Sequence, residues 1–482
     1  MMDNAGNTST NWVYEEDFRD SIATVDEMGK RLWVYPKKPA GYYHRLRIFA
    51  STVLLSLLFA GPFIKINGQP LLLLNFLERR FIIAGQAFWP QDFMLLALTL
   101  ITFFVFMILF TVAFGRLWCG WMCPQTLFME MVFRKIEFWI EGDANDQRKL
   151  NKEPWHAKKI LKKGSKQLVF LAIAILIAHT AMAYIIGIEN VVAIVQDSPS
   201  DHLAGFIGLV GFTLIFYSVF AYFREQACVV VCPYGRLQSV LLVKDSIVVA
   251  YDWLRGEPRG KIKKDIIQDA KRGDCIDCKL CLHVCPTGID IRNGTQLECV
   301  NCTACIDACD EVMVKIGKPK GLIRFASFHS IAQGVQKIFT PRVFGYSIVL
   351  TSLLLFLGFM VGSRSDVDTT ILKVSGTLYQ KRDNGSISNL YNVQFINKTF
   401  EKVQLQLRIE SPSGASLIKP DGDQVTVPAE GLLKTIYFVE IPADQIKSVS
   451  TTLYIGVYND LHRLERLKVK FIGPVNLKPA KP

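Results

Sequence analysis

The segment CIDCKLCLHVCPTG, residues 275–288, contains four cysteines in the spacing C-x2-C-x2-C-x3-C-P. The segment CVNCTACIDACD, residues 299–310, repeats this spacing, with Asp310 where the proline would stand. Three thiolates on one tight loop can hold three corners of an iron–sulfur cube, and the fourth corner must be reached from elsewhere. The two runs therefore predict two [4Fe–4S] clusters.

Bacterial two-cluster ferredoxins carry this run, and in them the fourth cysteine of each run binds the other cluster. A single C-x2-C pair would also be typical of a structural zinc site, but two complete runs favour iron and sulfide. Small residues such as Gly288 and Thr303 suit a backbone that wraps around a cluster. The predicted ligands are Cys275, Cys278, Cys281 and Cys309 for one cluster and Cys285, Cys299, Cys302 and Cys305 for the other. We expect a small ferredoxin-like domain with pseudo-twofold symmetry at about 270–315, acting as an electron relay.

Long apolar runs on both sides indicate that this domain belongs to a membrane protein. Half of the 482 residues are hydrophobic, and a helix needs about 20 apolar residues to cross a bilayer. The run at 71–85 contains Glu78, Arg79 and Arg80, so we predict that it lies at the membrane interface. Five spans are predicted, at residues 48–64, 93–113, 168–188, 203–223 and 343–362.

Lysine and arginine predict the orientation of these spans, because such residues gather on the cytoplasmic side. The loop 115–167 carries eleven of them and the loop 189–202 none, while segment 1–47 carries seven. We therefore expect a cytoplasmic N-terminus, a cytoplasmic ferredoxin-like insert and a C-terminal domain on the outer side of the membrane. The net charge of +12 is expected to meet lipid headgroups, as in KKILKKGSK (158–166), and predicts no nucleic-acid partner.

Two further cysteine pairs follow predicted spans, in RLWCGWMCPQT (116–126) and EQACVVVCPYGR (225–236). Each is C-x3-C-P. In a continuous helix such cysteines would share one face about 6 Å apart, but the proline bends or ends a helix. Soft sulfur ligands select Cu(I), and Met122, Met129 and Met131 could add thioether contacts. The pairs could bind copper, close a redox disulfide, hold another group or only pack helices. They are Cys119 with Cys123 and Cys228 with Cys232.

All twelve cysteines lie between residues 119 and 309, on the side predicted to be cytoplasmic. Disulfides are therefore not expected, because that compartment keeps thiols reduced. Two histidines, His179 within the third span and His202 at the start of the fourth, could ligate haem or copper or simply bond to neighbouring groups.

The composition changes after Ser365. Segments 403–409, 434–441, 451–458 and 465–473 alternate apolar and polar residues, as half-buried strands do, and turn sequences separate them. Several short strands in about 110 residues predict an all-β immunoglobulin-like sandwich without a disulfide. We expect a docking role or a structural cap. The predicted division of the chain is 1–47, 48–254 (four spans), 255–342 (the insert), 343–362 (the fifth span) and 365–482.

The order of these features resembles the cytochrome c oxidase accessory proteins of the FixG, RdxA and CcoG type over essentially the whole chain. The most specific parts are WCGWMCPQT (118–126), CVVVCPYGR (228–236) and the two ferredoxin runs. The resemblance implies a polytopic α-helical protein of the bacterial inner membrane, with an inserted two-cluster ferredoxin-like domain and a periplasmic C-terminal immunoglobulin-like sandwich. Asp310 departs from the general ferredoxin pattern but removes no ligand.

The resemblance also implies a function, that of a membrane cupric reductase supplying Cu(I) for assembly of cbb3-type cytochrome c oxidase. Implied partners are copper chaperones, oxidase assembly factors, membrane lipid and a cytoplasmic electron donor that the sequence does not identify. An oligomer is compatible with the sequence. Alternatives are a quinol-linked membrane ferredoxin subunit and a redox-sensing assembly scaffold. On the first reading, the catalytic or copper-binding thiols are Cys119, Cys123, Cys228 and Cys232.

Overall fold

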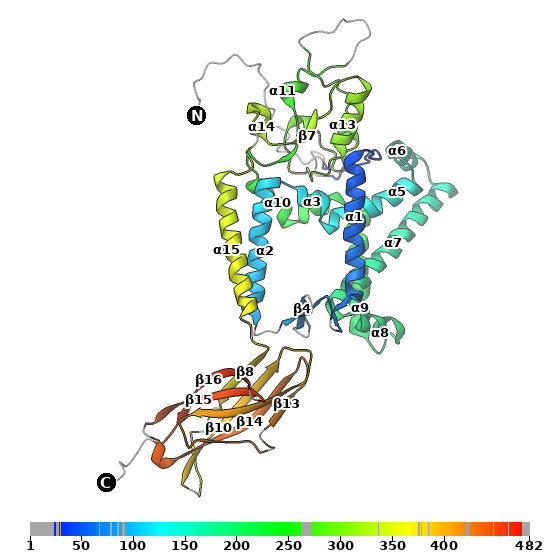
Figure 1. Ribbon diagram of the computed structural model, residues 1–482. Coiled ribbons are helices and arrows are strands. Elements are labelled where there is room, and N and C mark those ends of the chain that lie inside the picture. The colour runs from blue at the N-terminus through cyan, green and yellow to red at the C-terminus, as the bar shows by residue number, and fades with distance from the viewer. Residues whose placement is uncertain are drawn as a thin grey trace. The chain divides into compact units, whose positions relative to one another are not determined.

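The computed structural model, shown in Figure 1, divides into two compact units. One contains Met1–Ile64 and Leu98–Leu355, and the other contains Lys65–Ala97 and Phe356–Pro482. The finer domain limits stay predictions. The structure describes residues 24–25, 28, 30–66, 68–77, 80–83, 86–88, 92–261, 272–335, 337–374, 376, 378–383, 385–420, 422, 424–446, 448–460 and 462–474.

Five helices in the described residues are long and apolar enough to cross a membrane, which confirms the predicted number of spans. Two of them, α1 and α7, begin well before the predicted residue. The α1 helix begins at Tyr42 because the Asp307 carboxylate accepts hydrogen bonds from two N–H groups of its first turn. The basic start of α7 is helical too, because lysines there form ion pairs with Glu141. The helices are α1 (Tyr42–Ala60), α2 (Phe93–Phe114), α7 (Ala157–Ile186), α9 (Leu203–Ser218) and α15 (Pro341–Gly362).

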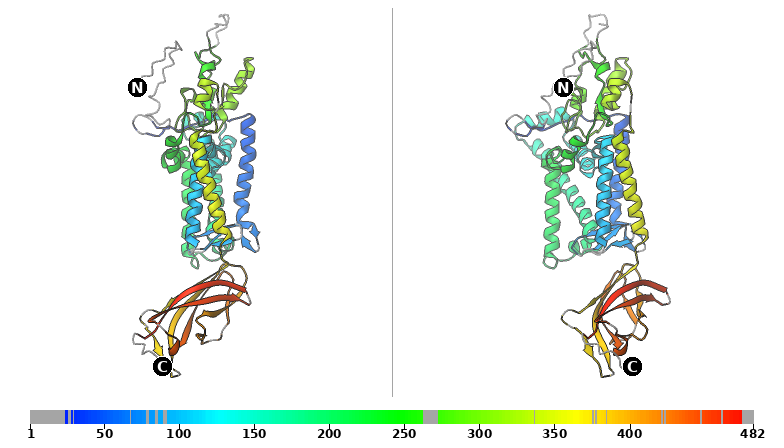
Figure 2. Two further views of the ribbon diagram at one scale, coloured as in Figure 1. Left: turned by 60° about the vertical axis from the view of Figure 1, so that its left-hand side comes forward. Right: turned by 90° about the vertical axis from the view of Figure 1, so that its left-hand side faces the viewer.

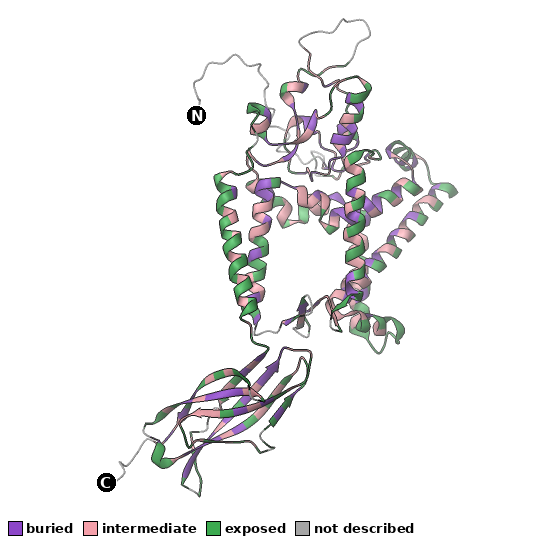
Figure 3. Ribbon diagram, in the orientation of Figure 1, coloured by how far each residue is buried: buried purple, intermediate pink, exposed green. Residues whose placement is uncertain are grey.

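The α15 helix is exposed over much of its length, as its green colour in Figure 3 shows. Leu355 and Phe359 are 70% and 69% exposed, which suits a helix surrounded by lipid. Its N-terminal part lies beside α2 in Figures 1 and 2, and Val343 packs there against Val112 and Ala113. The helix is therefore attached to the rest of the first unit near its own beginning.

The insert between α9 and α15 forms a small domain with its own core. Strand β6 (Val248–Tyr251) pairs antiparallel with β7 (Ile323–Ala326), and two helices, α12 (Leu280–His283) and α13 (Ala304–Lys315), follow the cysteine loops. Apolar side chains from the strands and from α13 pack together with cysteines of the first run. The two cysteine loops thus have a common scaffold.

The C-terminal part of the second unit is a sandwich of two antiparallel sheets, as predicted. One sheet has the order β12 (Ser416–Ile418), β14 (Leu432–Pro442), β10 (Ser386–Asn397), β8 (Val367–Lys373), with β9 (Gln380–Lys381) also on β10. The other has the order β13 (Gln424–Val427), β11 (Val403–Ser411), β15 (Ser450–Asn459), β16 (His462–Ile472). The sequence did not predict β10, because this strand is buried along nearly its whole length and lacks alternation.

Segment 71–85, expected at the membrane interface, forms strands of a three-stranded antiparallel sheet. The strands are β3 (Leu72–Asn75), β4 (Arg80–Ile83) and β5 (Gln86–Phe88). A hairpin of β1 (Lys65–Ile66) and β2 (Gln69–Pro70) precedes them. Asp92 joins the parts of this unit, since its carboxylate lies 2.8 Å from Lys398 Nζ and 2.7 Å from Arg364 Nη2.

Candidate cluster and thiol sites

The insert contains two cavities lined by cysteines. Tyr251 and Arg292 also line the first, and Val249 and Thr287 also line the second. The cysteines of the first are Cys275, Cys278, Cys281 and Cys309; those of the second are Cys285, Cys299, Cys302 and Cys305, with Cys281 between the two. The structure thus brings together the same two sets of four thiols that the spacing pairs. Their roles as ligands stay a prediction.

The backbone of the two cysteine loops follows one pattern. Asp277 and Lys279 in the first loop have φ of 51° and 57°, and Asn301 and Thr303 at the matching positions of the second have 52° and 65°. Left-handed conformations are uncommon for such residues. Here they curl each loop so that its cysteines face one cavity, and a helix begins directly afterwards.

Burial of the cysteines favours the neutral thiol when no metal is bound. It raises the pKa of Cys281 and of Cys299 to about 12, and that of Cys302 to about 11. Iron must therefore displace these protons on binding. Among the described residues, no three His, Cys, Asp or Glu side chains group closely enough to hold a single ion. At least four thiols line each cavity, and four is the number that a [4Fe–4S] cluster takes.

Two buried arginines provide a second test of whether clusters fit. Arg47 and Arg116 are 3% and 5% exposed. Arg47 Nη2 and Arg116 Nε have no hydrogen-bond partner among the residues that the structure describes. A buried donor without an acceptor costs about 1–3 kcal/mol. Arg47 acts electrostatically on Cys302 and Arg116 on Cys299, both of which line the second cavity. Sulfur atoms of a bound cluster would be acceptors for such donors, so the surroundings of this cavity are compatible with the group.

The first C-x3-C-P pair spans a break between helices, not one helical face. The α2 helix ends at Phe114, and α3 (Leu117–Trp121) carries Cys119. Cys123 is extended and precedes α4 (Pro124–Leu127). The proline is the first residue of the new helix, where its missing N–H costs no hydrogen bond. The sulfurs of Cys119 and Cys123 therefore do not lie on one face of a continuous helix.

The second pair is built in the same way from π-helical turns. After α9 come η5 (Val219–Phe223) and η6 (Ala227–Val231), and the latter contains Cys228. Cys232 is extended and precedes α10 (Pro233–Leu241). Each proline thus starts a helix directly after the second thiol of its pair.

The two pairs lie within electrostatic reach of each other. Burial raises the pKa of Cys228 to about 12, and Cys123 acts in the same direction. Burial raises the pKa of Cys119 to about 11, opposed by a hydrogen bond from Gln238, whose Nε2 lies 3.4 Å from the sulfur. All four thiols are free. The structure therefore gathers both pairs in one region, and within the described part of the chain they form no group close enough to hold a single ion.

This thiol region touches the second cluster cavity. A Cβ on Gly120, between Cys119 and Cys123, would lie 2.3 Å from the carbonyl oxygen of Val300, which lines that cavity. The indole N–H of Trp121 donates to the carbonyl oxygen of Asn301 at 3.3 Å. The loop that joins the first thiol pair is thus packed directly on the Cys299–Cys302 loop.

Comparison with known proteins agrees with this arrangement. Family models match residues 96–142 as a 4Fe-4S binding domain, residues 223–328 as a 4Fe-4S dicluster domain, and residues 357–474 as an "IG-like fold at C-terminal of FixG". Protein RdxB of Cereibacter sphaeroides is 33% identical over 448 residues, which cover 88% of this chain and 93% of that protein. The chain belongs to the FixG/RdxA family.

Other members are similarly close to this FixG/RdxA chain. Protein RdxA of Cereibacter sphaeroides is 32% identical and covers 79% of this chain and 83% of its own length. Nitrogen fixation protein FixG of Rhizobium meliloti is 30% identical, with 83% and 84% covered. With the 4Fe-4S models and the five apolar helices, these relatives make the chain a membrane electron-transfer protein of oxidoreductase type with iron–sulfur clusters.

The sequence did not point to a buried ion-pair network beside the second thiol pair of this FixG/RdxA protein. Arg224 has φ 52° and donates two hydrogen bonds to Glu137, at 2.8 and 2.6 Å. The next residue, Glu225, lies 2.9 Å from Arg31 Nη2. The network holds the backbone bend at Arg224, and the turn that contains Cys228 follows this bend. Its one sequence signal is an arginine near each C-x3-C-P pair, Arg116 and Arg224.

The histidines and methionines have ordinary partners. His179 Nδ1 lies 2.7 Å from the carbonyl oxygen of Ile175 in its own helix, and His202 Nε2 lies 3.0 Å from Asp197. Met129 packs in the aromatic core around Phe133. Metal ligation by these residues, and by Met122 and Met131, stays a prediction.

Proposed function

We propose that this protein is a cupric reductase, which passes electrons from the insert to copper at the C-x3-C-P thiols. The packing of Gly120 on Val300 carries the proposal, because it places a thiol loop against a cluster loop with no intervening segment. When bound in the two cavities, the clusters relay single electrons. The substrate takes one electron, and Cu(II) becomes Cu(I).

The four thiols have the chemistry to favour the product. Thiolates are soft ligands and select Cu(I) over harder ions. Cys119, Cys123, Cys228 and Cys232 are free and lie within electrostatic reach of one another. Copper is the substrate here, so the pairs bind it in passing and need not form a closed cage beforehand. Gln238 orients the sulfur of Cys119 through its amide.

The proposed setting follows the distribution of lysine and arginine. The thiols and the insert lie at the cytoplasmic face of a bacterial inner membrane, and the immunoglobulin-like domain lies in the periplasm. A cytoplasmic donor supplies the electrons. Copper chaperones receive Cu(I) and deliver it for assembly of a cbb3-type cytochrome c oxidase.

A chelator assay tests this function. Full-length protein in nanodiscs is reduced without oxygen, freed of excess reductant and mixed with Cu(II) and a Cu(I)-specific chelator. We expect Cu(I) from the natural protein and little from the variant with Cys119, Cys123, Cys228 and Cys232 all changed to serine. Cluster absorbance confirms that the variant keeps its clusters. Normal Cu(I) formation by that variant would exclude a role for the thiols.

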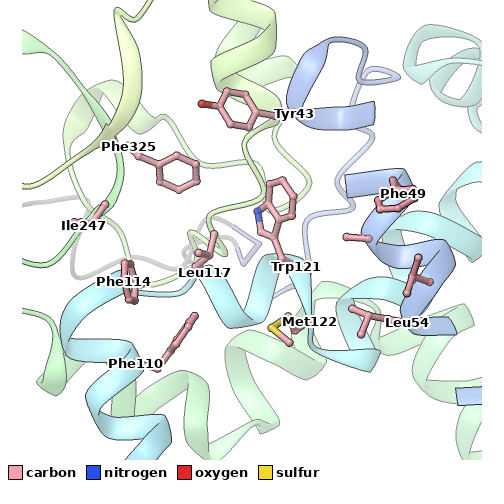
Figure 4. A pocket seen from close by; sticks show the side chains of 12 residues that line it. Tyr43, Phe49, Leu54, Phe110, Phe114, Leu117, Trp121, Met122, Ile247 and Phe325 are labelled. Atoms are coloured by element: carbon pink, nitrogen blue, oxygen red, sulfur yellow. The ribbon is translucent and has the colours of Figure 1, made fainter. Parts of the chain in front are cut away.

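An apolar cavity of about 770 Å³ favours a second candidate function, oxidation of a membrane quinol. Figure 4 shows its wall, which includes Phe49 and Leu54 of α1, Trp121 and Met122 of the first thiol loop and Phe325 of the insert. Its volume is in the range of small-molecule sites. Its α1 side chains belong to a candidate span, so a lipid-soluble molecule could enter from the membrane.

A quinol suits this cavity because its ring can stack on the aromatic wall beside two redox sites. Its oxidation to the quinone releases two electrons, one for each cluster, and two protons to water. Ala50→Trp fills the cavity and should prevent reduction of the clusters by a short-tailed quinol, while dithionite still reduces them. Leu57→Trp, on an exposed part of α1, is the control. Equal reduction of all three proteins by quinol would exclude this function.

A further inference from the structure

Arg47 connects α1, the first thiol loop and the second cluster cavity. Its Nε donates to the carbonyl oxygen of Gly120 at 2.8 Å, and Gly120 packs on Val300. The charge of Arg47 opposes the rise in the pKa of Cys302, whereas Glu130 acts in the opposite direction. Glu130 forms an ion pair with Arg134, whose Nε lies 3.3 Å away, so its negative charge is balanced. The net local effect is a positive charge beside the second cavity.

Arg116 lies on the other side of the same contact. Its guanidinium donates to the carbonyl oxygens of Leu297 and Gly235, so it joins the cluster loop to the second thiol region. Burial lowers the pKa of the Arg116 guanidinium, and Cys119 and Cys299 as thiolates would oppose this, followed by Glu298. Arg116 therefore lies between a thiol pair and a thiol of the second cavity.

Each arginine has a buried hydrogen-bond donor that a bound cluster could use. Arg47 Nη2 and Arg116 Nε lack a hydrogen-bond partner among the described residues, although both side chains are buried. Hydrogen bonds to cluster sulfur and net charge both set the reduction potential. Reduction adds one negative charge, so a buried cation and a hydrogen-bond donor both favour the reduced state.

The arginine beside the first cavity is already paired. This arginine, Arg292, is held by two carboxylates, with distances of 2.6 Å to Asp290 and 2.6 Å to Asp277. Asp310 stands directly after Cys309 and raises the pKa of that thiol, behind burial and the other cysteines. Lys279 lines the same cavity, and Arg259 acts on both carboxylates. The difference from the second cavity therefore lies in the donors, because Nε, Nη1 and Nη2 of Arg292 all donate to carboxylates.

We propose that Arg47 and Arg116 make the second cluster the electron exit, by holding its reduction potential above that of the first and by joining its loop to the thiol loops. One electron leaves the first cluster, which is oxidised, and reaches the second, which is reduced; this transfer is then downhill toward Cys119. The inference rests on the ligand sets and the relay of the proposed function. It does not depend on copper as the acceptor.

Redox titration followed by electron paramagnetic resonance tests this proposal on full-length protein in nanodiscs, without copper. Cys278→Ser changes the signal of the first cluster and so assigns the two signals. In Arg47→Gln and in Arg116→Gln, we expect the ratio of reduced to oxidised second cluster to fall about tenfold at fixed solution potential. This corresponds to a midpoint about 59 mV lower for one electron. The first cluster should keep its midpoint.

Three variants separate electrostatics from simple loss of structure. Arg47→Lys keeps the charge and should recover part of the midpoint. Arg45→Gln removes an exposed arginine from the same helix and should shift neither midpoint. Asp290→Asn should raise the first midpoint even if an arginine variant fails to retain its clusters. The proposal is overturned if the first cluster has the higher natural midpoint, or if Arg47→Gln and Arg116→Gln retain both clusters and both midpoints.

Discussion

Gly120 lies in the loop between Cys119 and Cys123 and packs against the insert. Any side chain there would enter the space of a backbone carbonyl, because the nearest atom to an added Cβ is Val300 O at 2.3 Å. Backbone atoms cannot turn aside as a flexible side chain can. The glycine therefore permits the closest approach between the Cys119–Cys123 loop and the Cys299–Cys302 loop.

Gly120→Ala should push these loops apart and slow electron transfer between them. We expect the rate of Cu(I) formation to fall about 10- to 100-fold, as for other misplacements of about 1 Å, with both clusters retained. Gly164→Ala is the matched control, since nothing lies within 4 Å of an added Cβ on that helical glycine. An unchanged rate in Gly120→Ala would show that this contact is not the route of the electron.

The cysteines could be predicted from the sequence because their spacing is local. The contacts that join the cysteine loops to the rest of the chain could not be predicted in this way. Arg47 meets Gly120, 73 residues away, and the N–H group of Tyr43 meets Asp307, 264 residues away. No spacing rule joins such pairs, since only folding brings them together. For the same reason Arg116 could be noted as a neighbour of Cys119 but not as a bridge to Leu297.

At the scale of elements, three π-helical segments adjoin the thiol pairs: η4 (Phe128–Phe133), η5 and η6. Such turns are rare and are frequent at functional sites. The buried ion pair of Arg224 with Glu137 holds η5 against α5 (Arg134–Ile140), and both side chains are 3–4% exposed. This ion pair fixes where the fourth span ends and therefore where η6, the segment that contains Cys228, begins.

Breaking this pair should destabilise the protein strongly. Glu137→Gln leaves Arg224 buried without its bidentate carboxylate, and we expect a loss of about 3–5 kcal/mol. Removing both charges, as Glu137→Leu with Arg224→Met, should cost less. Thermal unfolding in detergent measures both. Glu311→Gln breaks an exposed pair with Lys315 and should cost less than about 1 kcal/mol. Equal losses in Glu137→Gln and Glu311→Gln would contradict a structural role for the buried pair.

Elements were predictable where one physical pattern dominated. Apolar length identified the five spans, and alternation identified β11, β14, β15 and β16. Prediction failed where tertiary contacts decide the element. The start of α1 depends on Asp307 as an acceptor. The break at Cys123, in contrast, lies directly before Pro124, where the sequence predicted a bend or an end of the helix.

At the scale of the whole molecule, the proposed orientation determines which compartment supplies electrons and copper. Ser413→Cys introduces an exposed thiol in the cysteine-free sandwich, and Lys320→Cys introduces one in the insert. In intact spheroplasts, we expect a membrane-impermeant maleimide to label the first variant, and to label the second only after lysis. Labelling in the reverse order would invert the proposed direction of the electron and of the copper.

The central claim is that electrons leave the insert through the paired thiols. A single-turnover stopped-flow experiment without oxygen tests it, with cluster absorbance and the Cu(I)–chelator colour recorded together after reduced protein meets Cu(II). The account predicts one Cu(I) for each electron lost from the clusters, at one common rate. It also predicts slow cluster oxidation when Cys119, Cys123, Cys228 and Cys232 are all serine. Cluster oxidation and Cu(I) formation at the natural rate in that variant would contradict it.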